Sequence, residues 1–207
     1  LSQGARGRNA ARATVADCAN LLIAVNASGC VVKDAPMAID EFRKLEFVLA
    51  HGGFIEKHRA REYAPVEAEA LKFLDNRDAT FGEILESIID GFVSRDLEVF
   101  MLEEASKFVN IDAARARQGN NEAAVKSDVQ DGARRFIRQE FVRFDVSFRR
   151  PKPFAEVVVS RSNAGAQETL CCAQFSIGRP MDIKGDRRDV ASIGCATFLK
   201  VAEVMRE

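Results

Sequence analysis

The apolar residues of this chain change their spacing once, near residue 141, and this change limits the fold more than any other feature. Before that point they recur every three or four residues, which is the period of a helix with one buried face. After it, apolar and polar residues alternate, as they do in a strand with one face in the core. The alternating apolar positions are Val142, Phe144, Val146 and Phe148. Helices followed by strands predict an α+β fold.

The part of the chain before this change is predicted to be an N-terminal helical bundle. Its clearest helix begins at Thr80, which forms a capping box with Glu83. Six apolar residues then share one helical face: Phe81, Ile84, Leu85, Ile88, Ile89 and Phe92. Helices are also expected over residues 14–28, where Thr14 and Asp17 have the spacing of a second capping box, and over 34–51. The Gly and Asn residues at 118–121 end this part.

The part that follows is predicted to contain helix, three strands and helix. The strands are expected at 142–149, 154–159 and 169–177. Short turns between consecutive strands favour an antiparallel meander. The last helix is expected from about Asp189, with Val190 and Ile193 on its buried face. The predicted fold is thus an N-terminal helical bundle followed by a small three-stranded antiparallel sheet flanked by helices.

These patterns divide the chain into three segments. We expect a flexible basic arm at 1–13, a helical domain at 14–117 and an α-β-β-β-α domain at 122–207. Hydrophobic residues make up 47% of the chain, which supports a packed core and argues against a disordered protein.

The overall charge and the cysteines indicate a cytoplasmic protein. The net charge is −1, so nothing draws the whole chain toward nucleic acid or a membrane surface. No apolar run reaches the roughly 18–20 residues that cross a bilayer. The five cysteines are odd in number and two are adjacent, which indicates reduced thiols. We therefore expect no membrane partner.

Residues of the kinds that bind metals or attack substrates are present but not grouped. Gly52 and Gly53 interrupt any helix that would join His51 to His58, so we expect no metal site. Cys171 and Cys172 are expected to point to opposite faces of a strand, one in the core and one on the surface. The acidic residues opposite the apolar stripes are predicted to be solvated: Glu83, Glu86, Asp90, Glu98, Glu103 and Glu104. No catalytic, metal-binding or cofactor-binding residue and no cofactor is predicted, which favours a non-enzymatic protein.

Two local groups of basic residues remain. Arg6, Arg8 and Arg12 lie on the Gly-containing arm, which could follow phosphates or enter a minor groove. The second group comprises Arg134, Arg135, Arg138, Arg143, Arg149, Arg150 and Lys152. We predict Arg6, Arg8 and Arg12 as weak, non-specific nucleic-acid contacts.

Parts of the chain resemble a poorly characterised group of bacterial, often prophage-associated, regulator-like proteins. The segments that carry the resemblance are 4–11, 14–25 and 32–35, together with 185–188 leading to 193–194. In that group a short helix-turn-helix segment precedes the arginine-rich stretch. The resemblance implies that this chain begins just after that segment and lacks the recognition helix.

Two functions are consistent with these patterns. The first is a non-enzymatic accessory region of a bacterial or phage DNA-binding regulator, which acts mainly by associating with itself or another protein. The second is a small-molecule-binding module or enzyme subunit, with a site between the helical and sheet parts. A deep pocket with convergent polar groups between the two parts would favour the second.

Overall fold

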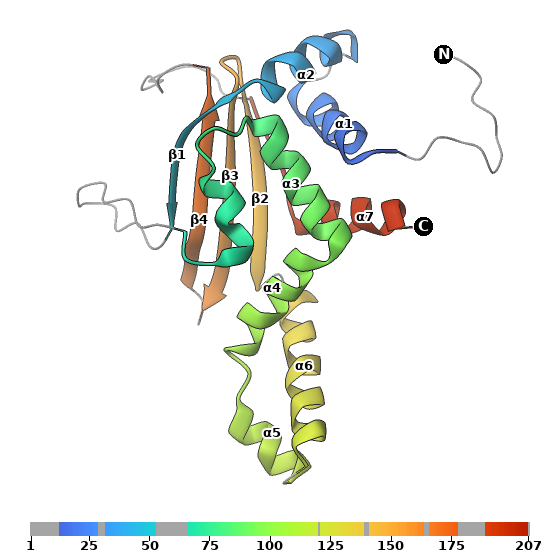
Figure 1. Cartoon of the computed structure of the whole chain (residues 1–207), viewed down its shortest axis with the longest axis vertical. Helices are drawn as coiled ribbons and strands as arrows, with labels where there is room; N and C mark the ends of the chain where they lie inside the picture. The colour runs from blue at the N-terminus through green and yellow to red at the C-terminus, as the bar shows by residue number, and fades with distance from the viewer. Residues whose placement is uncertain are drawn as a thin grey trace, which may run out of the picture.

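The computed structural model describes residues 13–28, 32–52, 66–119, 121–138, 141–163, 166–177 and 189–206. They form an α+β fold around a five-stranded antiparallel sheet (Figure 1). The strands are β1 (Glu46–Gly52), β2 (Val142–Arg150), β3 (Phe154–Asn163), β4 (Ala166–Ser176) and β5 (Asp189–Ile193). Their order across the sheet is β1-β4-β3-β2-β5.

Helices precede, interrupt and follow the strands. The α-helices are α1 (Val15–Ala27), α2 (Ala35–Arg43), α3 (Phe81–Ser94), α4 (Asp96–Ser106), α5 (Ile111–Gln118), α6 (Glu122–Arg138) and α7 (Cys195–Arg206). Two short 3-10 helices, η1 (Val32–Asp34) and η2 (Glu69–Asp75), lie between them. Figure 1 shows α5 and α6 as a hairpin that extends away from the sheet and the other helices.

The predicted meander is confirmed, but the sheet has five strands and not three. Strands β2, β3 and β4 pair in sequence order, as the short turns indicated. The first additional strand, β1, occupies residues 46–52, which we had predicted as the end of a helix. Helix α2 stops at Arg43 instead, and β1 pairs antiparallel with β4. A short apolar run is compatible with the spacing of a helix and with that of a strand. Here the hydrogen bonds offered by the edge of β4 favour the strand.

The second additional strand, β5, replaces the beginning of the predicted final helix. It pairs with β2, and α7 begins only at Cys195, after Gly194. Val190 is therefore not on the buried face of a helix, and its side chain is 57% exposed at the edge of the sheet. The expected N-terminal bundle is only partly present, because the segment before residue 117 also supplies a strand to the sheet.

Both capping boxes form as their sequences predict. At α3, the Glu83 backbone N–H donates to Thr80 Oγ1 at 3.4 Å, and the Thr80 N–H donates to Glu83 Oε2 at 2.8 Å. The bond from the Thr80 N–H, with a second from the Thr80 hydroxyl to Glu83 Oε2 at 2.9 Å, holds the pKa of Glu83 below its usual value, because both donate to the carboxylate. Thr14 and Asp17 form the same box at α1.

The core is one continuous cluster of apolar side chains that runs from α1 to α7. Its centre is a set of phenylalanine rings between the helices and the inner face of the sheet. Phe144 of β2 meets Phe92 of α3 at a ring-centroid distance of 5.5 Å, and Phe92 stacks on Phe198 of α7 at 5.6 Å. Phe81 of α3 bridges Phe148 and Phe175, each at 5.6 Å.

Replacing Thr80 with alanine should lower the free energy of unfolding by about 1 kcal/mol, because a helix N–H loses its acceptor. Urea denaturation measures the change. Thr80→Ser keeps the hydroxyl and should stay close to the wild type. An unchanged midpoint in Thr80→Ala would mean that the box does not stabilise α3.

Phe144→Ala should lower the free energy of unfolding by about 3–5 kcal/mol, since the ring is fully buried and its loss leaves a cavity. The matched control is Phe154→Ala, which removes the same ring from the opposite face of the sheet, where Phe154 is only half-buried. The control should lose clearly less. If the two variants lose equal amounts, the assignment of the sheet faces is wrong.

Candidate functional site

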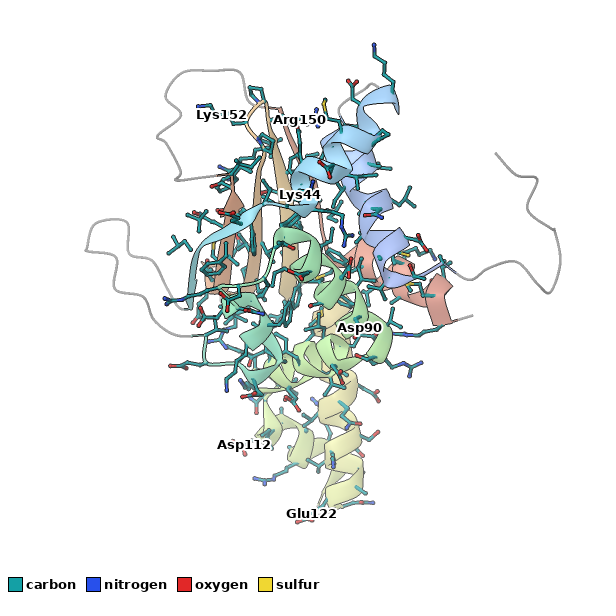
Figure 2. The ribbon with its side chains drawn as sticks, turned by 45° about the horizontal axis from the view of Figure 1, so that its top comes forward. Lys44, Asp90, Asp112, Glu122, Arg150 and Lys152 are labelled. Carbon is teal, nitrogen blue, oxygen red and sulfur yellow. The ribbon has the colours of Figure 1, made fainter. Side chains whose placement is uncertain are left out.

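The predicted nucleic-acid contacts Arg6, Arg8 and Arg12 lie outside the described residues, so their role stays a prediction. In the second basic group, Arg149 and Arg150 have acidic and aromatic neighbours. Arg149 Nη2 donates to Glu156 Oε2 at 2.9 Å. Arg150, close to Lys152 in Figure 2, packs over the ring of Phe42 with Nη2 3.9 Å from Glu41 Oε2.

The histidines and cysteines do not assemble a reactive centre in the described part of the chain. His51 lies in β1, and His58 lies outside the described residues. No group of three potential metal ligands occurs within the described ranges. Cys171 and Cys172 face opposite sides of β4, but both are buried, so the expectation of one surface cysteine is wrong. Burial raises the pKa of each thiol to about 12, and both stay protonated at neutral pH.

The interface between helices and sheet is filled with aromatic side chains. The rings of Phe42, Phe81 and Phe92 from the helices interlock with those of Phe144 and Phe148 from the sheet. Phenylalanine has no polar group to bind a ligand, and close ring contacts leave no room for one. A small-molecule site between the two parts is therefore not favoured by this packing.

An ion network around the buried carboxylate of Glu104, at the end of α4, is a feature that the sequence did not reveal. Glu104 is only 7% exposed, although we had predicted it on a solvated face. Its carboxylate accepts from Arg161 Nη1 of β3 at 2.7 Å and also pairs with Lys107. Arg161 Nε donates to Glu168 of β4 at 2.8 Å, and the guanidinium packs over Phe108 at 5.2 Å.

This network joins α4 to two strands at the point where the chain leaves for the α5–α6 hairpin. The hydrogen bond to Glu168 is the largest effect that raises the pKa of Arg161, so its charge is secure. A paired, buried carboxylate holds its partners in one geometry because an unpaired charge there is costly. The network therefore fixes the base of the hairpin against the sheet.

The α5–α6 hairpin, which we call the arm, carries an open groove on its surface. The groove has a volume of about 590 Å³. It is lined by Ser106, Ile111, Arg115, Gly119, Glu122, Val125, Lys126, Val129 and Gln130. Apolar Ile111, Val125 and Val129 lie among charged and polar residues, which is the composition of a groove that binds a protein helix.

The groove escaped the sequence analysis because it combines two helices that are separated by a turn. A helix after the Gly and Asn residues at 118–121 was expected, and α6 lies there. Its strong one-sided apolar pattern was the available signal. The sequence did not show that α5 would leave part of that apolar face uncovered.

A second groove, of about 760 Å³, lies between η2, α3 and α4. Its wall contains Phe73 and the half-exposed Val99, together with Asp90, Asp96 and Glu103. Carboxylates around an opening repel phosphates, so this surface does not suit nucleic acid.

Comparisons with protein-family models, with curated proteins and with solved structures give no match for this chain. Among the described helices, none has the length and apolar character to cross a membrane. The candidate site is therefore the arm, identified by its own geometry and chemistry.

Replacing Glu104 with glutamine should lower the free energy of unfolding by roughly 1.5–3 kcal/mol, because Arg161 and Lys107 lose a charged acceptor and the amide NH2 cannot accept from either of them. The neighbouring Glu103 is exposed and provides the matched control. Glu103→Gln should leave the urea midpoint almost unchanged. Equal effects of the two substitutions would show that the buried network does not stabilise this end of α4.

Proposed function

We propose that this chain is a non-enzymatic accessory region of a bacterial or phage DNA-binding regulator, which acts in the cytoplasm mainly through protein association. The arm is the observation that carries the proposal. It extends away from the sheet and its covering helices (Figure 1), and it keeps an apolar groove open on its surface. An exposed helical groove of this composition is a common binding surface for another protein helix.

Two further observations support this function over a ligand-binding module. The contact between helices and sheet is packed with phenylalanine rings. The adjacent thiols Cys171 and Cys172 are buried, and burial raises the pKa of each to about 12. The proposal therefore places the activity on the surface of the protein.

Association can be tested by fusing the whole chain to a DNA-binding domain that is monomeric by itself. If the chain brings regulators together, the fusion should bind paired half-sites more tightly than the bare domain, because the second binding event becomes intramolecular. Single half-sites provide the control and should show no gain. A fusion that binds both DNAs like the bare domain would contradict the proposed function.

The chain without any fusion should bind duplex DNA weakly and without sequence preference, through Arg6, Arg8 and Arg12. Three phosphate contacts predict a slope of about −3 in a plot of log affinity against log salt, from roughly −0.9 per phosphate. Replacing the three arginines with alanine should abolish this binding. Titrations at two salt concentrations measure it, and tight, sequence-selective binding at physiological salt would show that a recognition element lies within this chain.

A further inference from the structure

The described side chains of the arm, at 111–119 and 122–132, are mostly not buried, although they belong to helices. Among the described side chains of α5, that of Ala114 alone is buried. In α6, none of the described side chains from 122 to 132 is buried. Ile111 is 47% exposed, and Val125 and Val129 are half-buried in the groove. Short helices with so little packing are marginal in water, so the arm would gain stability from a partner.

One face of α6 carries both the apolar and the charged residues of the groove. Glu122, Val125, Lys126 and Val129 follow the spacing of adjacent turns, so their side chains form one stripe. Among the described residues, neither Glu122 nor Lys126 has an ion-pair partner within its own chain. Two opposite charges, one helical turn apart beside an apolar stripe, are therefore available to another molecule.

We propose that the partner is a second copy of this chain, which pairs with the first through their arms about a two-fold axis. This inference rests on the proposed function and names its partner. If the two α6 helices run antiparallel and the axis passes midway between Glu122 and Lys126, each Glu122 faces the Lys126 of the other copy. The interface is then self-complementary in charge, as a two-fold interface requires.

The position of the arm permits this pairing without a collision of the two molecules. Figure 2 shows Glu122 at the far end of the arm, away from the sheet. Two arms that overlap near their ends keep the sheets and their covering helices at opposite ends of the dimer. The overlap is short, so the dimer is weak and its population rises with protein concentration.

Charge reversal tests the pairing directly. Glu122→Lys and Lys126→Glu each set like charges opposite one another in a homodimer, and each should weaken self-association by about tenfold or more. An equal mixture of the two variants should recover the wild-type mass, because every cross-pair is again opposite in charge. The mass at rising protein concentration, from sedimentation equilibrium or light scattering, is the measurement.

A matched control separates this effect from the change in net charge that each reversal makes. Asp40 of α2 and Lys44, the residue that caps this helix, are exposed at the same four-residue spacing, with Lys44 Nζ 2.6 Å from Asp40 Oδ1. Asp40→Lys and Lys44→Asp should leave self-association unchanged. Circular dichroism should show that all four variants keep the helix content of the wild type.

The outcomes distinguish this inference from the proposed function. A wild-type dimer that is insensitive to both arm substitutions overturns pairing through the arm, while a gain in the fusion assay still supports association through another surface. A wild-type chain that stays monomeric overturns the self-pairing. If the fusion also shows no gain on paired half-sites, the proposed function fails with it.

Discussion

The fold depends on the phenylalanine rings that fill the space between α3 and the inner face of β2. Phe92 lies between Phe144 of the sheet and Phe198 of α7, so one side chain connects three elements. Phe81, at the opposite end of α3 from Phe92, contacts the rings of Phe148 and Phe175. A phenylalanine ring needs no hydrogen-bond partner, so this interface can be dry and closely packed. Helix α3 is therefore held between the sheet and the outer helices along its whole length.

Because the interface between helices and sheet is filled with rings, a binding site is more readily placed on the surface. The arm, which extends away from the sheet and carries a groove, is the surface feature that we consider. The ion network of Glu104, Arg161 and Glu168 ties the end of α4 to two strands just before the arm begins. Beyond that point few of the described side chains of the arm are buried. The arm is thus anchored to the sheet where it begins and exposed at its far end. Such a segment can hold another molecule at a set distance from the sheet. Both the proposed association and the inferred pairing of arms use this arrangement.

Several local features could be predicted from the sequence because they depend on neighbouring residues. The capping boxes at Thr14 and Thr80 and the alternation along β2 form as expected. The prediction of a helix over 34–51 was wrong for its second half, since a short apolar run after Arg43 is compatible with a strand as well as with a helix. The contribution of Arg6, Arg8 and Arg12 to DNA binding stays a prediction, because these residues lie outside the described part of the chain.

The sequence by itself determined the fold class, the three central strands and the presence of a helix before the first of them. Only the tertiary structure decided that residues 46–52 and 189–193 complete the sheet, because each needs a strand that is far away in the sequence: Glu46 pairs with Ser176, and Arg150 with Asp189. The burial of Glu104 was decided in the same way, by an arginine 57 residues further along the chain. Apolar periodicity and capping residues indicate which secondary structure a segment prefers locally. Strand pairing and burial depend on the other segments that pack against it in the folded protein.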